Sequence, residues 1–130
     1  SIPVLVNGDI NSLDDVQKAL SQSGAHGVMI GRGAQGRPWL LGQAGDLLSN
    51  QEIRSHPSIA QKREIMLSHL DDMLICYGTD GMRLARKHIA WSAHGMSGSA
   101  ALRDVANNTH DSHIVFDAVK RFFNEQNETA

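Results

Sequence analysis

The sequence predicts an α/β segment followed by an all-α helical bundle, with helix as the dominant secondary structure overall. Two short apolar runs near the beginning, residues 2–6 and 27–30, enclose one segment of helix length. A strand, a helix and a second strand in this order form the β-α-β unit of a parallel sheet. Beyond residue 57 apolar residues recur only at the spacing of helices, which predicts a helical second half.

The first strand and the helix after it have recognisable ends. Residues 2–6 are apolar and mostly β-branched, and Pro3 is tolerated at the beginning of a strand. An apolar run without alternation is typical of a strand that is covered on both faces. Ser12 is expected to cap the following helix, with Asp15 in an approximate capping box, and Gly24 is expected to end it.

A short helix and a connector are expected between the two halves. Pro38 is expected to begin a helix over residues 39–41, since proline fits the first turn of a helix. The mixed sequence of residues 42–57 is expected to be a connector. Ser58 and Gln61 form a capping box for the first helix of the second half. Four helices are expected there, over residues 59–77, 81–94, 99–106 and 111–124.

Apolar stripes predict the core of the helical half. Apolar residues recur every three or four positions, so one face of each helix is expected to point to a shared core. Asp80 is expected to cap the helix over residues 81–94. The core-facing residues are expected to be Ile65, Met66, Leu70, Met73, Leu74 and Tyr77, then Met82, Ala85, Ile89, Ala93 and Met96, and finally Val115, Phe116, Val119, Phe122 and Phe123.

The composition limits the classes of protein. A net charge of -2 over 130 residues gives no argument from the total for a nucleic-acid or membrane partner. Cys76 is the single cysteine, so no internal disulfide is possible, and its apolar helical neighbours predict a small core residue. With no bilayer-length apolar run and no signal-like start, a cytoplasmic protein is expected. The chain begins inside a strand without an initiator Met, which favours a processed product or an excised piece.

Both predicted strands end in residues that are suited to bind an anion. Ligands of parallel α/β proteins bind at the carboxyl ends of the strands, where glycines such as Gly33 and helix N-termini offer backbone N–H groups to a phosphate. The fork-shaped guanidinium of Arg32 adds a permanent positive charge. Asn-Gly-Asp alone is also a turn signal, and Gly-x-Gly alone is a weak signal for a ligand. Arg37 is compatible with either a ligand contact or a structural role. The candidate anion-binding residues are Asn7, Gly8, Asp9, Gly31 and Arg32.

A local basic strip is predicted on the helix over residues 81–94. From this helix to residue 103 the chain has four Lys or Arg residues and no Asp or Glu. A strip of this kind is expected for contacts to a phosphate backbone, although a solvated helix face has the same composition. On a helical wheel, His88 lies at the margin of an apolar face formed by Leu84 and Trp91. The strip between this face and the opposite apolar face consists of Arg83, Arg86, Lys87 and His94.

Seven histidines raise the question of a metal site. His110 and His113 are three positions apart, and Asp111 and Asp117 are close to them in the sequence. Structural metal sites usually add cysteine or further spaced ligands, whereas an isolated pair is typical of exposed polar residues or of helix capping. No metal is therefore expected.

Three motifs resemble those of a known family. They are Val-Asn-Gly-Asp-Ile at residues 6–10, Met-Ile-Gly-Arg-Gly-Ala-Gln-Gly-Arg-Pro-Trp at residues 29–39 and Met-Arg-Leu-Ala-Arg-Lys-His-Ile-Ala-Trp at residues 82–91. In order and spacing they are similar to the bacterial tRNA-dihydrouridine synthases, in particular to the B-type, nitrogen-regulation-associated branch. The resemblance implies an FMN-binding TIM barrel followed by a helical domain that holds tRNA. It also implies an enzyme that uses NADPH to reduce the C5=C6 bond of uridines.

The resemblance further implies roles for individual residues. The positions that match family contacts to FMN, chiefly around its phosphate, are Asn7, Gly8, Asp9, Gly31 and Arg32. Those that match the tRNA-contacting helix are Arg83, Arg86, Lys87 and His88. The family's catalytic cysteine has no counterpart here, since Cys76 lacks the motif that surrounds it, so no catalytic residue is assigned.

The chain is therefore expected to be a carboxyl-terminal fragment of such an enzyme. Residues 1–45 would be the last two βα units of the barrel and residues 46–130 the helical tRNA-binding domain. The fragment alone is expected to be inactive. Two parallel strands leave open edges, so they are expected to self-associate, pack on the helices or refold locally, while the helical part from about Ser58 is the independently ordered core.

Two alternatives remain open at the level of sequence. One is a non-catalytic RNA-binding helical module, and the other is a piece of another flavin- or phosphate-binding barrel enzyme. A proton-donating cysteine loop in the upstream sequence would separate the synthases from other barrel enzymes.

Overall fold

The computed structural model describes residues 1–126, which form two compact units. The first unit is Ser1–His56, and the second begins at Pro57. The described residues contain six α-helices, one short 3₁₀ helix and two parallel strands, so the chain is mostly helical, as predicted. The domain boundary predicted after residue 45 falls inside a helix, and the two units divide further along, after His56.

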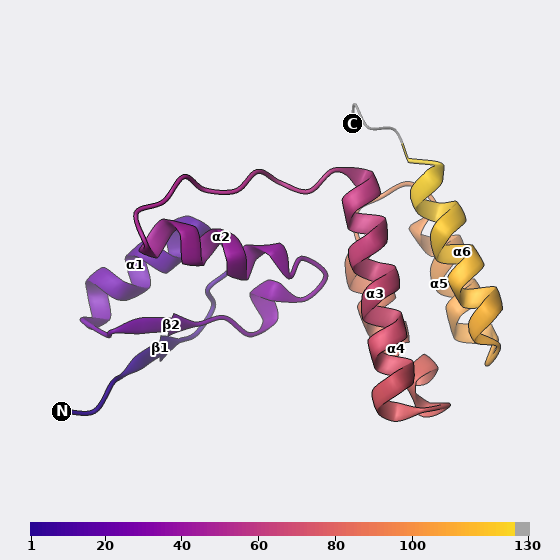
Figure 1. Cartoon of the computed structure of the whole chain (residues 1–130), viewed down its shortest axis with the longest axis horizontal. Helices are drawn as coiled ribbons and strands as arrows, with labels where there is room; N and C mark the ends of the chain where they lie inside the picture. Colours follow the sequence, from indigo (N-terminus) through magenta and orange to yellow (C-terminus); the bar gives the residue numbers. More distant parts are fainter. Residues whose placement is uncertain (127–130) are drawn as a thin grey trace. The chain divides into compact units, whose positions relative to one another are not determined.

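The first unit contains the predicted β-α-β arrangement (Figure 1). Its elements are β1 Leu5–Asn7, α1 Leu13–Ser23, β2 Gly27–Met29, η1 Arg32–Ala34 and α2 Trp39–Leu48. β1 and β2 pair in parallel, with Leu5 opposite Gly27 and Asn7 opposite Met29. α1 packs on both strands, and α2 packs on α1.

Local sequence determines both ends of α1. The Ser12 side chain accepts a hydrogen bond from the Asp15 N–H at 3.1 Å, which satisfies one of the N–H groups that the first turn leaves unpaired. Gly24 has a left-handed backbone with φ of 66° and ends the helix. The predicted cap and the predicted end of α1 are confirmed.

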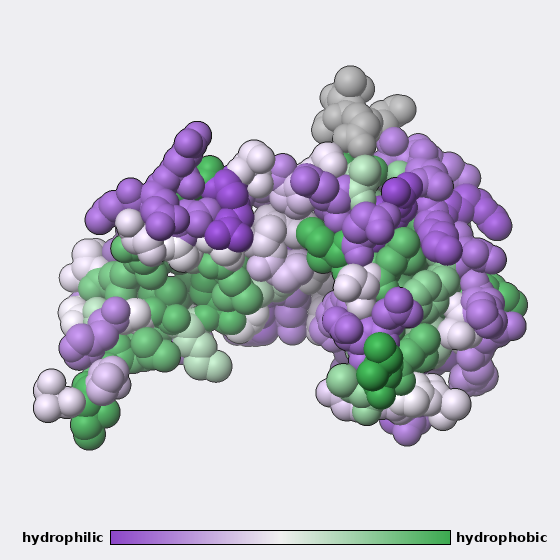
Figure 2. Space-filling model, viewed as in Figure 1, coloured by the Kyte–Doolittle hydropathy of each residue, from purple (hydrophilic) through white to green (hydrophobic). Residues whose placement is uncertain are grey.

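The first unit covers its two-stranded sheet on one face only. On that face Val16 of α1 has no exposed surface and packs with Ile10 and Ala44 in a small cluster. On the other face Leu5 is 61% exposed and Met29 is 55% exposed. Hydrophobic surface over this unit is visible in Figure 2. The sequence predicted that both faces of the sheet are covered, but the elements of the first unit cover only one of them.

α2 is longer than predicted. The predicted helix covered residues 39–41 and left residues 42–57 as a connector, whereas α2 continues to Leu48. In this region the Arg54 guanidinium donates to both oxygens of the Asp46 carboxylate, at 2.7 and 2.8 Å, and the Arg54 N–H donates to it at 2.9 Å. The connector therefore folds back onto α2, and tertiary contacts of this kind override weak helix propensity.

Four helices form the second unit: α3 Ile59–Tyr77, α4 Asp80–Ser92, α5 Ser99–Asn108 and α6 Ser112–Asn124. Their ends lie within two residues of the predicted ones. α3 and α5 each pack on both α4 and α6, so the four helices surround one core. The predicted capping box is confirmed: the Gln61 N–H donates to the Ser58 hydroxyl at 3.2 Å, and the Ser58 N–H donates to the Gln61 side chain at 2.8 Å.

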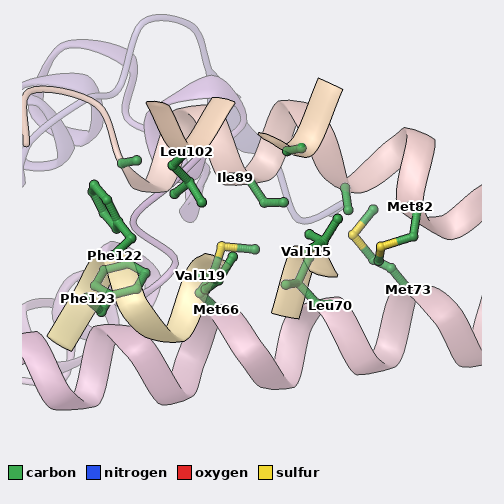
Figure 3. Close-up of a cluster of buried hydrophobic side chains, with 13 residues drawn as sticks. Met66, Leu70, Met73, Met82, Ile89, Leu102, Val115, Val119, Phe122 and Phe123 are labelled. Atoms are coloured by element: carbon green, nitrogen blue, oxygen red, sulfur yellow. The ribbon is translucent and has the colours of Figure 1, made fainter. Parts of the chain in front are cut away.

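Figure 3 shows the core of the second unit, to which all four helices contribute. Leu70 and Val119 have no exposed surface, and Ile89 is 1% exposed. The buried residues are Met66, Leu70, Met73, Met82, Ala85, Ile89, Ala93, Leu102, Ala106, Val115, Val119, Phe122 and Phe123. The predicted core faces of α4 and α6 are therefore confirmed.

Predictions at the junction of α3 and α4 were wrong. Tyr77 is 58% exposed, and Cys76 is exposed too, so neither is a core residue. The apolar period continues to the end of α3, but the chain turns away at Gly78 and leaves the last helical turn at the surface. Asp80 is the first residue of α4 and Thr79 occupies the cap position.

Candidate functional site

The two parallel strands end side by side. Because Asn7 is opposite Met29, the segments that follow β1 and β2 leave the sheet at the same edge. These segments approach each other closely, since a Cβ on Gly33 would lie 2.1 Å from the carbonyl oxygen of Ile10. Only glycine fits there without a backbone shift, and Gly33 is buried. The contact joins the two strand ends into one local structure.

A hollow of about 410 Å³ lies between these strand-end segments. Its backbone turns sharply, with positive φ at Gly8 (130°) and at Asp9 (49°). A Cβ on Gly31 would meet nothing within 4 Å, so the backbone there is open to a ligand. The hollow is lined by Asn7, Gly8, Asp9, Ile10, Asn11, Gly31, Arg32 and Gly33. The structure thus brings together all five residues that the sequence singled out for anion binding.

Arg32 is the cation of this hollow. Its guanidinium donates to the Asp9 carboxylate at 3.3 Å, and the two side chains are 85% and 87% exposed. An exposed ion pair of this kind contributes only about 0.2–1 kcal/mol. A phosphate group can therefore compete with Asp9 for the guanidinium at little cost.

Arg37 has a structural role. Its Nε donates to the Gly33 carbonyl at 2.8 Å, and a terminal nitrogen donates to the Asn11 carbonyl. The guanidinium therefore links the segment that follows β2 to the segment that follows β1. Of the two roles considered from the sequence, these contacts match the structural one.

The first turn of α1 and the residue before its cap make hydrogen bonds within the chain. The Asp15 carboxylate accepts from the Asn11 N–H at 3.0 Å, and the Ser12 hydroxyl accepts from the Asp15 N–H at 3.1 Å. The hydrogen bond from Asn11, followed by that from Ser12, lowers the pKa of Asp15.

The basic strip on α4 divides into two kinds of residue. Arg83 and Lys87 are exposed, and within residues 1–126 neither makes a hydrogen bond or an ion pair. Arg86 instead donates to the Ala106 carbonyl at 3.0 Å and to the Thr109 carbonyl at 3.5 Å. Carbonyls in the last turn of a helix have no partner within that helix. Arg86 therefore caps α5, whereas Arg83 and Lys87 are accessible to a ligand.

His88 lies between two other rings. Its centroid is 4.6 Å from that of His69 on α3 and 5.1 Å from that of Trp91, and both contacts are edge-to-face. Burial, and then the charge of nearby His69, lower the pKa of His88 below its ordinary 6.5. The lowered pKa favours the neutral form of the His88 imidazole. His69 lies on another helix, so only the packing of α3 on α4 reveals its place beside the strip.

The described residues contain neither a metal-ligand cluster nor a membrane-spanning helix. Within residues 1–126 no three His, Cys, Asp or Glu side chains are placed to hold a metal ion. Asp111 caps α6, where its carboxylate accepts from the His113 N–H at 2.9 Å. No helix in the described part of the chain has both the length and the apolar character that crossing a bilayer requires.

The first unit is a parallel β-α-β unit with a hollow at its strand ends, and the second is a group of four helices of which α4 has exposed cations. Residues 1–127, which span both units, match the family model described as dihydrouridine synthase (Dus). The chain belongs to the dihydrouridine synthase family.

Individual relatives agree with this assignment. A protein of Rickettsia conorii named probable tRNA-dihydrouridine synthase is 40% identical over 129 residues, which is 98% of this chain and 39% of the relative. Proteins named tRNA-dihydrouridine synthase B from Xanthomonas axonopodis pv. citri and Pseudomonas aeruginosa are 44% and 35% identical over 82% and 97% of this chain, and over 32% and 38% of their own length. The resemblance to the B-type branch is confirmed. The chain spans about 39% of the length of the first of these relatives.

Proposed function

We propose that the chain is part of an FMN-dependent tRNA-dihydrouridine synthase, a cytoplasmic enzyme that reduces the C5=C6 bond of specific uridines in tRNA with NADPH. The observation that carries the proposal is the hollow at the ends of β1 and β2, where all five predicted phosphate-contacting residues meet. The family match over residues 1–127 supports it. In this proposal residues 1–45 belong to the end of a TIM barrel, and the helices of the second unit contact tRNA.

The residues of the hollow fit the phosphate end of FMN. Gly8 and Gly31 have no side chain to block the approach of an oxygen atom, and the Arg32 guanidinium is exposed and weakly paired. The Asn7 amide adds a neutral donor at the same edge. Bound FMN would supply the hydride chemistry, and the residues of this chain would hold and orient its phosphate. The proton donor and the contacts to the flavin ring are proposed to come from other parts of the enzyme, so this chain alone is inactive.

The exposed cations of α4 support the proposed contact with tRNA. Arg83 and Lys87 are exposed and make no hydrogen bond or ion pair within residues 1–126. Contacts between such cations and the phosphates of RNA depend steeply on salt concentration. Arg86 takes part indirectly by fixing the end of α5, and His88 lies on the same helix as these cations, in contact with His69 of α3.

The test uses the full-length protein, purified with its bound flavin. Arg32→Ala removes a charge-assisted contact and is expected to weaken FMN binding about 10- to 100-fold, with less dihydrouridine in tRNA by mass spectrometry. Arg103→Ala, an exposed arginine on α5, is the matched control and is expected to retain flavin. A full-length protein that binds no flavin and forms no dihydrouridine would rule the proposal out.

A further inference from the structure

A cluster of three rings borders the exposed cations of α4. His69 from α3 contacts His88, and His88 contacts Trp91, with both pairs edge-to-face. All three residues are half-buried, so each keeps part of its surface in contact with solvent. Both helices belong to the second unit, and they pack directly on each other. The cluster is thus a fixed feature of one unit.

Helix geometry places this ring cluster directly beside the positive charges. Trp91 follows His88 by three positions and Lys87 by four, so it neighbours both on the helix surface. Arg83 precedes Lys87 by four positions and continues the row of cations. The buried row on the opposite side of α4 includes Ala85 and Ile89, so the rings and cations share the outward face.

The charge of this face is one-sided. Between residues 81 and 103 the chain has no Asp or Glu, while Arg83 and Lys87 are exposed and unpaired within the described residues. Burial and the neighbouring His69 lower the pKa of His88. The face therefore combines fixed positive charge with partly exposed ring surface. That combination fits single-stranded nucleic acid, whose phosphates need cations and whose bases need π-surface.

We infer that His69, His88 and Trp91 form a contact platform for an unpaired RNA base, next to phosphates held by Arg83 and Lys87. The inference rests on the proposed function and adds to it a base-contacting part of the RNA surface, including His69 on α3. A platform of this kind favours an unstacked nucleotide, such as one in a loop of a folded RNA, over a base within a duplex.

Tryptophan fluorescence tests the platform without altering the rings. The chain has two tryptophans, so a Trp39→Phe variant reports Trp91 alone. Titration of this variant with a single-stranded oligouridine is expected to quench the emission, since a stacked base contacts the indole. A duplex RNA of equal length is expected to bind through the cations with little quenching. Equal quenching by both RNAs, or by neither, would overturn the base contact.

Substitutions separate base contact from helix packing. Trp91→Leu is expected to weaken oligouridine binding about 5- to 100-fold, the range for one base–aromatic stack, whereas Trp91→Phe keeps a ring and most of the affinity. His69→Leu is expected to weaken binding in the same direction, and His113→Leu, an exposed histidine on α6, is the matched control. Circular dichroism of each variant reports whether the helices remain folded. Folded Trp91→Leu and His69→Leu variants with unchanged affinity would contradict the platform.

The cation variants distinguish failure of the platform from failure of the proposed function. Arg83→Ala and Lys87→Ala are each expected to reduce the salt dependence of tRNA binding by about one ionic contact. If tRNA binding shows this dependence while the ring variants and the Trp91 emission do not respond, only the platform is wrong. If the chain binds neither tRNA nor oligouridine, both the platform and the RNA-binding role fall.

Discussion

The two units differ in how completely each buries its own apolar residues. In the second unit Leu70 and Val119 have no exposed surface, and buried side chains from four helices form one cluster. In the first unit Val16 is as well buried, but its cluster has only two other buried members, Ile10 and Ala44. The strand residue Leu5 remains 61% exposed. The first unit, which contains the hollow at the strand ends, thus has the smaller core of the two.

The predicted FMN-binding residues lie in the first unit, whereas most of the buried apolar side chains lie in the second unit. Each fully buried aliphatic side chain contributes about 1.5–3 kcal/mol, and the second unit has many more of them than the first. Two strands with one open face are not expected to be stable alone. We therefore expect the helices of the second unit to hold their structure alone, and the first unit to need further cover or to self-associate through its exposed strands.

The largest effect is expected in the core of the second unit. Ile89→Ala removes a side chain that is 1% exposed and leaves a cavity, so the free energy of unfolding should fall by about 2–5 kcal/mol. Ile75→Ala is the matched control because Ile75, on α3, is 81% exposed, and its effect should stay within about 0.5 kcal/mol. Urea denaturation followed by circular dichroism measures both. Equal losses in the two variants would refute the assignment of the core.

A smaller effect is expected where the strand-end segments meet. Gly33→Ala would place a Cβ 2.1 Å from the Ile10 carbonyl oxygen and force the two segments apart, at a cost of about 1–3 kcal/mol. Gly31→Ala meets no atom within 4 Å, so it should leave the fold intact and disturb only a bound anion. Hydrogen exchange of the segments after β1 and β2 should accelerate in Gly33→Ala alone. Unchanged exchange in that variant would show that the close contact is not needed.

A still smaller effect separates two arginines of the same helix. Arg86→Ala leaves the Ala106 carbonyl at the end of α5 without its donor and should destabilise the second unit by about 1 kcal/mol. Arg83→Ala should leave stability within about 0.5 kcal/mol and weaken RNA binding instead. Thermal unfolding and tRNA titration of both variants measure the division. Lower stability in Arg83→Ala, or weaker RNA binding with unchanged stability in Arg86→Ala, would contradict these two roles.

The smallest effect is confined to acid and to the first unit. The Arg54 side chain and N–H donate to the Asp46 carboxylate and lower its pKa to about 2 from an ordinary 3.8. The stabilisation is complete above pH 3.8 and is lost as the pH falls towards 2, because the unfolded chain takes up the proton first. Trp39 fluorescence in a Trp91→Phe background follows this loss. In Asp46→Asn the stability of the first unit should depend less on pH below 3.8. An unchanged dependence on pH would exclude Asp46 as the cause of the loss.

Sequence alone predicted what depends on near neighbours. The capping box of Ser58 and Gln61 and the end of α1 at Gly24 rest on residues a few positions apart, and they were predicted correctly. The parallel pairing of β1 and β2 followed from the order of elements, which made the strand ends meet at one edge.

What the sequence did not reveal depends on tertiary contacts. The return of Arg54 to Asp46 and the contact of His69 with His88 require helix packing that periodicity does not contain. Arg83 and Arg86 have the same chemistry on one strip, and only the position of α5 gives Arg86 a structural partner. The exposure of Cys76 depends on where the chain turns after α3.

Hydrogen exchange of the 130-residue chain, read by mass spectrometry, tests the contrast between the units most directly. Slow exchange is expected in α3, α4 and α6, close to the rate of global unfolding, and fast exchange is expected in β1 and β2. Protection of β1 and β2 equal to that of α3 would contradict this contrast, because the first unit would then be as stable as the helices of the second.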